Sequence, residues 1–482
     1  MALKPLWTHC CAARDGRCGF RGLNGHSSHI RRLCESDCEL LHRETLESLS
    51  HGVQSGCRGF NVMFEVLLTD SEKRIRDEVR AFVRDKVDRS LILSMDSREK
   101  EYPYEFVKAL GQANLIGLRF PKKYGGRGLG WVSEMVAIEE VGVLGIALGC
   151  AYSLPSIIGE GVNRLGTEEQ KRRYLLPTLR GEKICGEGLT EPRGGSDFFG
   201  TNTTAVKRGD RFLINGEKRF VAGGVGADYF LVYAKTDFTG PPHKSLSAFL
   251  VNRDSGVKVE EEYELMGCRG MGAARIVLNN IEVPETDLVG GLNAGYDVFN
   301  AMMVPERLTS AAGAIGMGRA ALEIAVRYSD KREAFGQKIS RFEGVSFKVA
   351  DCATQLDAAR GLVYHAAKKA DTDAWCRKEV SQAKVFATEA GFQAIHESMQ
   401  MLGGIGYTNV YPIERLFRDA RLGITWTGSN EVQRLIIQNE VYKEILSEDR
   451  SFKRDVELDT PGAHKTGEKV FSEPADKYLR PS

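Results

Sequence analysis

Residues 188–200 read GLTEPRGGSDFFG, and the character of the chain changes at this stretch. Before Cys185 the patterns are typical of helices, whereas after it short runs rich in β-branched and aromatic residues alternate with Gly, Asn and Asp. Pro192 and the two glycines that follow it predict a turn whose backbone amides are free to face a ligand, and Thr190 and Ser196 add hydroxyl groups. Judged on composition alone, an ordinary surface loop is the more frequent interpretation of such a stretch.

The residues before this stretch, 63–184, are predicted to form an N-terminal helical domain. TDSEKRIRDEVRAFVRDKV offers Thr69 or Asp70 as a helix cap and continues with apolar residues at helical spacing. WVSEMVAIEEVGVLGIALGCAYSLPSIIGEGVNRLG, which begins at Trp131, is apolar enough to form a pair of buried helices.

The residues after it are predicted to form two further domains. Five β-rich runs predict a small antiparallel barrel or sandwich over 185–294, and we take the barrel as the prediction. Residues 295–448 return to the helical pattern, and we expect their long helices to pack as a four-helix bundle. The fold class is therefore predicted to be α+β and mostly α. The long helical segments are 296–330, 341–370, 377–402 and 429–446.

A Rossmann-type fold is the tempting alternative, because glycine clusters recur in GGSDFFG, GGVGAD, GAIGMG and GGIGYT. None of these clusters follows a strand and opens a helix within a βαβ unit, which phosphate binding by that motif requires. We therefore do not predict this fold.

Bulk composition excludes several classes of function. The chain has 482 residues, enough for two or three domains, with 42% hydrophobic and 27% charged residues, as in an ordinary globular protein. A formal net charge of +1 gives no indication of a nucleic-acid partner or an anionic membrane. No uninterrupted apolar run reaches about 18 residues, so no membrane-spanning helix is predicted.

The two ends of the chain are predicted to flank the folded domains. Residues 1–62 hold six of the eleven cysteines and lack apolar periodicity, so we interpret them as an unstructured or extraneous extension. Cys34 and Cys38 have zinc-ligand spacing, but no second pair completes a site, and no metal site is predicted. Early arginines hint at a transit peptide, yet acids become frequent from Glu35, so we predict the cytoplasm, with the mitochondrial matrix second. Residues 449–482 are predicted to be a flexible tail.

With these elements in place, the sequence resembles the acyl-CoA dehydrogenase family. GLTE at 188–191, GGSD at 194–197 and Gly200 match the first signature of that family. QMLGGIGYTNVYPIERLFRD at 400–419 matches the second, except at Val410, where an acid or amide is usual. PKKYGGRGLG, KREAFGQ and IEVPETDLVG also occur in the family's order. The resemblance covers roughly residues 64–447.

This resemblance implies FAD as the cofactor, held at the junction between the barrel and the bundle. Ala222 replaces the usual threonine, which removes one hydroxyl contact. Part of the site would reach the FAD of a neighbouring subunit, which implies an obligatory assembly, typically a homotetramer. The implied FAD residues are Leu189, Thr190, Gly195, Ser196, Phe220 and Ala222, then Gly428, Ser429 and Glu431, and, toward a neighbour, Arg332, Phe335, Gln400, Gly403 and Gly404.

The implied reaction is the α,β-dehydrogenation of an acyl-CoA thioester to the 2-enoyl-CoA, in which a base removes an α-proton and flavin N5 takes the β-hydrogen as hydride. In many family members the base is a glutamate directly before the glycine of the 428–429 turn. Thr427 stands there in this chain, and a threonine hydroxyl is not a base near neutral pH. Isovaleryl-CoA and long-chain acyl-CoA dehydrogenases instead carry the base on the helix that reads MMVPERLTSAAGAIG here. The matching residue, Glu306, is therefore predicted as the base.

Four residues are implied to contact the substrate. Ser196 would face the CoA thioester, and Trp426 would form a wall of the acyl pocket. Thr427 would donate its backbone N–H to the thioester oxygen, whatever its side chain. Arg307 would meet the CoA portion, although a surface arginine is an equally frequent interpretation.

The electrons would pass to an electron-transferring flavoprotein. The same residues fit an enoyl-CoA reductase, which runs the reaction backwards. A DNA-binding alkylation-response-type flavoprotein is the alternative from another class, and the near-neutral charge argues against it. The sequence does not reveal the length, branching or ring content of the acyl group.

Overall fold

The computed structural model describes residues 62–372 and 375–447, together with Lys453, Arg454, Val456 and Asp459. Contacts divide the chain into two units, Met1–Val66 and Leu67–Ser482. The predicted N-terminal extension, with its Cys34–Cys38 pair, and most of the predicted tail lie outside the described residues. A 3₁₀ helix, Val62–Leu67, is the first described element, and the fold below is that of the second unit.

Helices fill the first part of this unit, as predicted. Thr69 is the cap of the first long helix: Thr69 Oγ1 accepts a hydrogen bond from Glu72 N at 3.3 Å, and Glu72 Oε2 accepts one from Thr69 N at 2.7 Å. The predicted buried pair is confirmed as α5 and α6, which are separated at Gly145, where φ is 114°. The helices are α2 (Asp70–Lys86), α3 (Arg89–Asp96), α4 (Tyr104–Gln112), α5 (Trp131–Gly142), α6 (Ile146–Leu165), α7 (Glu168–Gln170) and α8 (Leu176–Leu179).

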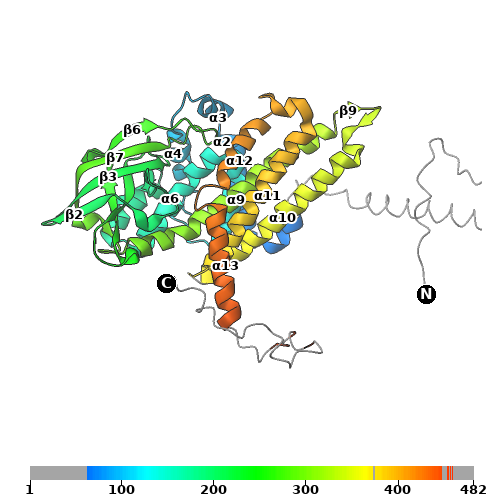
Figure 1. Cartoon of the computed structure of the whole chain (residues 1–482). Helices are drawn as coiled ribbons and strands as arrows, with labels where there is room; N and C mark the ends of the chain where they lie inside the picture. Colours follow the sequence, from blue (N-terminus) through cyan, green and yellow to red (C-terminus); the bar gives the residue numbers. More distant parts are fainter. Residues whose placement is uncertain (1–61, 373–374, 448–452, 455, 457–458, 460–482) are drawn as a thin grey trace, which may run out of the picture. The chain divides into compact units, whose positions relative to one another are not determined.

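The five predicted β-rich runs are all confirmed as strands of one sheet (Figure 1). Neighbouring strands follow the order β6-β7-β3-β2-β4-β5-β8, and β1 pairs with β4 in parallel. The described strands do not close into the predicted barrel. β6 ends the path with three exposed acids, Glu260, Glu261 and Glu262, a charge pattern typical of an edge strand, and β8 at the other end has only two residues. The strands are β1 (Cys185–Gly188), β2 (Thr204–Arg208), β3 (Arg211–Val221), β4 (Tyr229–Lys235), β5 (Leu246–Asn252), β6 (Lys258–Glu262), β7 (Ala274–Pro284) and β8 (Leu288–Val289).

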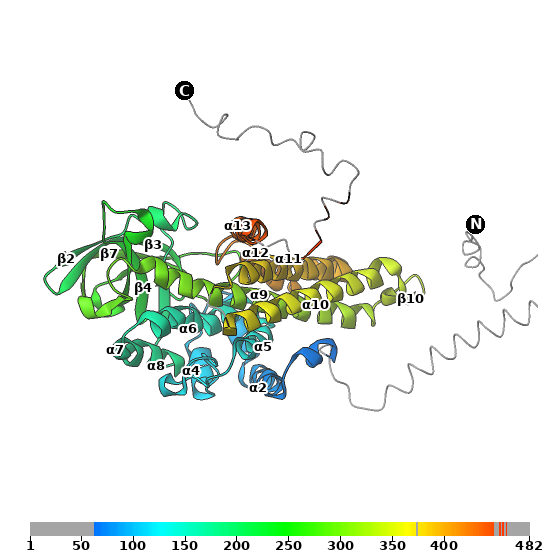
Figure 2. The same cartoon turned by 90° about the horizontal axis from the view of Figure 1, so that it is seen from below.

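Long helices return after the sheet. Figures 1 and 2 show α9, α10 and α11 running alongside one another, with a short hairpin of β9 and β10 at the end of α9 away from the sheet. The four predicted segments correspond to α9, α10, α11 and α13, whereas α12 is an additional helix. The elements are α9 (Gly295–Ser329), β9 (Glu333–Ala334), β10 (Gln337–Lys338), α10 (Glu343–Thr372), α11 (Arg377–Leu402), α12 (Ile413–Gly423) and α13 (Asn430–Ser447).

Strand β4 separates two apolar clusters. Its residues Tyr229, Leu231 and Tyr233 belong to the cluster that the sheet shares with the helices, whereas Phe230 and Val232 belong to a cluster within the sheet. Side chains of a strand alternate between its two faces, so β4 is buried on both. The helices therefore pack directly on one face of this strand.

Asp419 of α12 links three regions that are distant in sequence. Its carboxylate is buried and accepts hydrogen bonds from Ile146 N at 3.1 Å and from Cys268 N at 2.8 Å. Ile146 begins α6, and Cys268 lies between β6 and β7. One carboxyl group thus joins the first helices, the sheet and the last helices.

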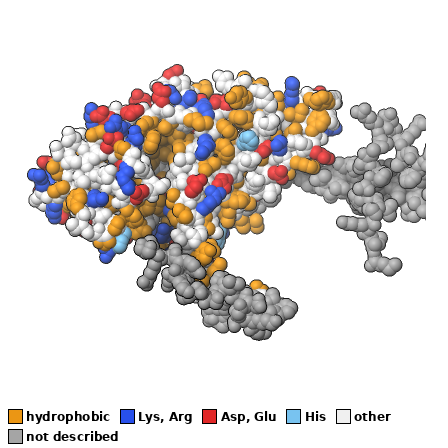
Figure 3. Space-filling view, viewed as in Figure 1, with side chains coloured by type: hydrophobic (Ala, Val, Ile, Leu, Met, Phe, Trp, Pro, Cys, Tyr) orange, Lys and Arg blue, Asp and Glu red, His pale blue; other side chains and the backbone are white. Residues whose placement is uncertain are grey.

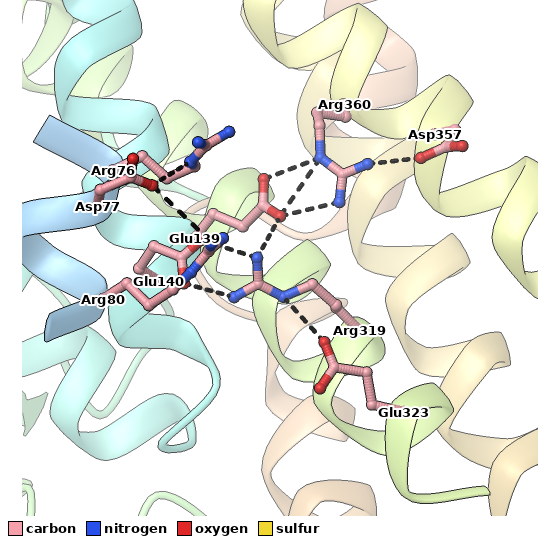
Figure 4. Close-up of polar contacts among 9 residues, drawn as sticks. All are labelled: Arg76, Asp77, Arg80, Glu139, Glu140, Arg319, Glu323, Asp357 and Arg360. Atoms are coloured by element: carbon pink, nitrogen blue, oxygen red, sulfur yellow. Dashed lines mark hydrogen bonds and ion pairs between the residues drawn. The ribbon is translucent and has the colours of Figure 1, made fainter. Parts of the chain in front are cut away.

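A largely buried network of arginines and glutamates joins α2, α5, α9 and α10 (Figure 4). Glu140 of α5 accepts two hydrogen bonds from Arg319 of α9, both at 2.8 Å, and two from Arg80 of α2, at 2.8 and 3.2 Å. The neighbouring Glu139 pairs with Arg360 of α10 at 2.8 Å. Burial by itself would raise the pKa of Glu140, but Arg319 and Arg80 lower it to about 2. The network therefore holds four helices together through charges that, except for the partly exposed Arg80, are buried.

Among the described helices, none is long and apolar enough to cross a bilayer. The cysteines in the described part of the chain are buried and free: Cys150, Cys185, Cys268, Cys352 and Cys376.

Candidate active site

Glu306, the predicted base, lies inside the protein. Only 7% of its surface is exposed, although a helical glutamate usually faces solvent. Burial raises the pKa of its carboxyl, and a hydrogen bond with Glu187, followed by the nearby charges of Arg307 and Lys384, opposes the rise. The net effect is a pKa above the ordinary value, which moves the carboxyl toward the range useful for a base.

A cavity of about 40 Å³ opens beside this part of α9. Thr309 and Ser310, one turn after Glu306, line it, and so does Cys150 of α6. Burial, followed by the charge of Glu306, raises the pKa of the Cys150 thiol. The remaining walls are largely apolar or glycine and include Ile138, Ile146, Gly149, Ile157 and Met317.

The loop between α12 and α13 forms one wall of the cavity through Trp426 and Thr427, both predicted to contact substrate. Thr427 has a φ of 53°, which is rare for a β-branched residue. Its Oγ1 accepts a hydrogen bond from Ser310 Oγ at 3.1 Å. Among the described residues, no acceptor bonds the Thr427 backbone N–H, which leaves this donor free for a ligand.

Lys384 of α11 holds the loop between α12 and α13 through hydrogen bonds. It is fully buried and donates hydrogen bonds to Gly428 O at 3.1 Å and to Asn430 Oδ1 at 2.7 Å. Burial lowers its pKa to about 8. Sequence reasoning missed Lys384, although a lone lysine among small residues in SQAKVFATEAG is a recognisable signal of a buried charge.

A second acid, Glu187 of β1, faces Glu306. The two carboxyl groups lie within hydrogen-bonding reach, and burial, followed by the charge of Glu306, raises the pKa of Glu187 well above its ordinary value. Sequence reasoning also missed this residue, which directly precedes the GLTE motif. An acid inside the otherwise apolar run ICGEGL was the available signal.

The predicted flavin residues at the start of the sheet lie close together in the structure. Leu189, Thr190, Gly195 and Ser196 belong to the segment after β1, and Arg219 N of β3 donates to Thr190 O at 2.7 Å. Ala222, just after β3, packs against the shared core.

Phe220 of β3 presents an aromatic ring at the edge of this loop. It is 56% exposed and has a φ of 52°, and its ring centroid lies 4.6 Å from that of Tyr263. Figure 3 shows hydrophobic side chains gathered in the hollow between the sheet and the helices. The edge of the sheet therefore offers an exposed, flat ring surface close to the Thr190 backbone.

Glu191 anchors the loop that carries these residues. Its carboxylate accepts hydrogen bonds from Asn202 N at 2.6 Å, Thr203 N at 3.0 Å and Lys218 Nζ at 2.8 Å. Lys218 is fully buried, and burial lowers its pKa to about 8. The acid of the GLTE motif is thus a structural residue that shapes the loop.

The residues predicted to reach a neighbouring subunit gather elsewhere. Phe335 is 96% exposed in the β9–β10 hairpin, close after the end of α9. The segment after α11 lies near the same end, because the Tyr411 ring packs 5.8 Å from that of Tyr328. This end is about 35 Å along α9 from Glu306, at roughly 1.5 Å per residue. The residues concerned are Arg332, Phe335, Gln400, Gly403 and Gly404, and their role toward a neighbour stays a prediction.

Two further predicted groups flank the cavity. Gly428, with a φ of 76°, Ser429 and Glu431 lead from the cavity loop into α13. Arg307, next to Glu306, is buried; burial, followed by the charge of Arg377, lowers its pKa to about 10. Its Nε has no hydrogen-bond partner among the described residues. Arg307 is therefore not a surface arginine, and its contact with CoA stays a prediction.

Family models match nearly the whole described part of the chain. The model of the acyl-CoA dehydrogenase N-terminal domain matches residues 69–182, that of the middle domain 186–281, and that of the C-terminal domain 293–442.

Individual proteins agree with these matches. An acyl-CoA dehydrogenase of Bacillus subtilis is 38% identical over 372 residues, which cover 77% of this chain and 97% of that protein. The caffeyl-CoA reductase-Etf complex subunit CarC of Acetobacterium woodii is 34% identical, with coverages of 76% and 97%. A glutaryl-CoA dehydrogenase of Mycobacterium smegmatis, solved in complex with FADH2, superposes with a TM-score of 0.74 at 26% identity and covers 80% of this chain and 97% of its own.

Proposed function

The chain belongs to the acyl-CoA dehydrogenase family, and on this premise we propose that it oxidises an acyl-CoA thioester to the 2-enoyl-CoA with Glu306 as the base. Members of this family are oxidoreductases. One observation carries the proposal: Glu306 is a buried carboxyl one turn before Thr309 and Ser310, which line an apolar cavity, while Thr427 occupies the other position of the family base.

FAD is the cofactor of this family, and the edge of the sheet fits a flavin. The exposed Phe220 ring offers a surface for a planar ring system, and Thr190 lies beside it, because its carbonyl accepts a hydrogen bond from the N–H of the preceding residue, Arg219. A Cβ added at Gly194 would meet nothing within 4 Å, so the loop leaves space for a ligand. The buried Nε1 of Trp426 also has no partner among the described residues. When bound, FAD supplies the acceptor for the β-hydrogen of the substrate.

The residues around the cavity have three further roles in the proposed reaction. Glu306 takes the α-proton, because it is a buried acid on the helix that borders the cavity and its pKa is raised. The free backbone N–H of Thr427 donates to the thioester oxygen as negative charge develops there, a contact typically worth about 3 kcal/mol of transition-state stabilisation. The apolar cavity walls exclude water from the acyl group.

The test is anaerobic bleaching of the purified yellow protein by a panel of acyl-CoA thioesters that differ in length, branching and ring content. We expect the flavin absorbance to fall rapidly with at least one thioester. If none bleaches the flavin, the proposal is wrong.

The reverse direction is a second candidate function, favoured by the similarity to a caffeyl-CoA reductase subunit. The same residues would then return a proton from Glu306 to the α-carbon of an enoyl-CoA. The test measures how fast enoyl-CoA thioesters reoxidise the flavin of the dithionite-reduced protein. Comparison of this rate with the rate of bleaching by acyl-CoA thioesters assigns the direction of the reaction.

Electron-transferring flavoprotein is proposed as the redox partner, because that relative belongs to an Etf complex. A homotetramer is proposed from the exposed Phe335 hairpin, whose predicted ligand is the FAD of a neighbour. The compartment stays a prediction from the sequence.

Lys218→Met is expected to weaken FAD binding by at least about tenfold. The substitution leaves the Glu191 carboxylate buried without a cation, which typically costs about 3 kcal/mol or more, and the flavin loop depends on that carboxylate. The ratio of FAD to protein after gel filtration and a titration of the apoprotein measure the effect.

Lys207→Met is the matched control, because Lys207 is exposed on β2 and pairs with Glu285 at 2.7 Å. If the Lys218→Met variant bound FAD as well as the unmodified protein does, the anchoring role of Glu191 would be contradicted.

Gly149→Leu is expected to narrow the range of acyl groups that the protein accepts. Gly149 lines the cavity, and a Cβ added there would meet nothing within 4 Å, so a leucine side chain would extend into the cavity. We expect kcat/KM for the preferred thioester to fall at least about tenfold relative to the shortest substrate of the panel.

Gly149→Ala is the graded control, with a smaller change of the same sign. Equal losses for short and long thioesters in the leucine variant would show that Gly149 does not border the acyl group.

A further inference from the structure

Strand β1 presents alternate residues to two different environments. A Cβ added at Gly186 would meet Phe230 and Val221, and one added at Gly188 would meet Val232, all within the sheet. Cys185 belongs instead to the cluster shared with the helices. Because side chains of a strand alternate, Glu187 points to the same side as Cys185, toward α6 and α9.

On that side Glu187 meets the carboxyl group of Glu306. The Glu187 Oε1 atom is buried and has no donor among the described residues. The nearby Tyr233 hydroxyl does not serve it, because it donates to Met302 Sδ at 3.1 Å. Two carboxyl groups form a hydrogen bond only when one of them holds a proton. The pair therefore shares at least one proton.

The groups that face this pair come from five elements. Cys150 of α6, Cys185 of β1 and Tyr233 of β4 feel its charge, and burial as the main cause raises the pKa of each, so all three are neutral near pH 7. Arg307 of α9 and Lys384 of α11 are the cations, and both favour the charged form of Glu306. The positive charges thus lie on the Glu306 side of the pair.

We propose that Glu187 is a positioning residue for the base: its neutral carboxyl donates a hydrogen bond to the Glu306 carboxylate, which keeps Glu306 charged and aimed for proton abstraction. The proposal rests on the proposed function of Glu306. The α-proton goes to Glu306 as the C–H bond breaks, the electron pair of that bond stays with the substrate, and Glu187 keeps its own proton throughout.

The distribution of charge supports this assignment. Burial and the neighbouring Glu306 charge raise the pKa of Glu187 well above its ordinary value, with no cation among the causes. For Glu306, in contrast, the hydrogen bond with Glu187, Arg307 and Lys384 all lower the pKa against the effect of burial. This asymmetry favours Glu187 as the residue that holds the proton of the pair.

The first test compares Glu187→Leu, which removes the donor, with Glu187→Gln, whose amide N–H replaces it. Loss of the donor raises the pKa of Glu306, so the acid limb of kcat/KM is expected to move to higher pH by about one unit in the leucine variant, a roughly tenfold loss below that limb. The glutamine variant is expected to keep the limb of the unmodified protein. Lys384, with a pKa of about 8, titrates on the alkaline side and does not affect this limb.

Glu282→Gln is the matched control, because Glu282 is exposed on β7. Superposition of the leucine and unmodified profiles would overturn the proposal. So would an equal shift in both Glu187 variants, or a loss of rate at every pH without movement of the limb, which would indicate a role in packing only.

The second test needs no substrate. Infrared difference spectra of the oxidised, FAD-loaded protein at neutral pH report the C=O stretch of protonated carboxyl groups. We expect Glu187→Gln to lose one such band and Glu306→Gln and Glu282→Gln to retain it. Loss in Glu306→Gln, or loss in none of the variants, would overturn the proposal. The infrared readout does not depend on turnover. The Glu187→Gln variant can therefore lose its carboxyl band even if no thioester bleaches the flavin, so the proposal for Glu187 and the proposed function can fail separately.

Discussion

Glu306→Gln is expected to fold and bind FAD but to lose about 10²–10⁴ of the rate of flavin reduction, the usual contribution of a general base. Glutamine has nearly the same shape and can still bond Glu187, so the substitution removes the base and little else. Anaerobic stopped-flow mixing with the best thioester measures the rate, and Glu282→Gln is the exposed control.

A double variant sharpens this test. Ser310 Oγ bonds Thr427 Oγ1, so a side chain at 427 reaches the turn of α9 that follows Glu306. Thr427→Glu in the Glu306→Gln background is expected to recover part of the lost rate. An unchanged rate in the single variant would show that another group removes the proton.

Arg319→Met is expected to lower the free energy of unfolding by about 3–5 kcal/mol, because it leaves Glu140 and Glu139 buried with fewer cations. Urea unfolding followed by circular dichroism measures the change. Arg327→Met is the control on the same helix, since the Arg327 side chain is exposed and pairs with Glu323 at 3.5 Å.

The same network predicts a pH dependence with a defined sign. The pKa of Glu140 is lowered from 4.5 to about 2, so its contribution to stability is present above pH 4.5 and is lost as the pH falls toward 2. We expect Glu140→Gln to be less stable at pH 7 and to lack this dependence. Similar unfolding curves for Arg319→Met and Arg327→Met would contradict the importance of the network.

Local sequence patterns predicted the individual helices and strands better than they predicted whether the strands close into a barrel. The Thr69 cap and the α5–α6 pair depend on neighbouring residues, and both are confirmed. Helix α12 was missed because it is short and follows a glycine-rich segment. The barrel was predicted from strand spacing, whereas closure depends on whether β6 and β8 can pair. The acids of β6 and the two-residue length of β8 leave both as edges.

The residues of the candidate site also differ in whether the sequence could predict them. Glu306 was identified through a family motif, because its own helix gives no sign of a cavity nearby. Glu187 and Lys384 come from other elements, and their importance arises only when β1, α9 and α11 pack together. Periodicity describes one element at a time, so it does not reveal a carboxyl pair formed across two of them.

The position of Asp419 has a consequence for how this protein can be divided. A chain cut between the first helices and the sheet, or between the sheet and the last helices, would leave Ile146 N or Cys268 N without its acceptor in a buried site. The three segments that match separate family models are therefore not modules to be expressed or exchanged one at a time. Chimaeras between relatives should exchange Asp419 together with both of the loops that it holds.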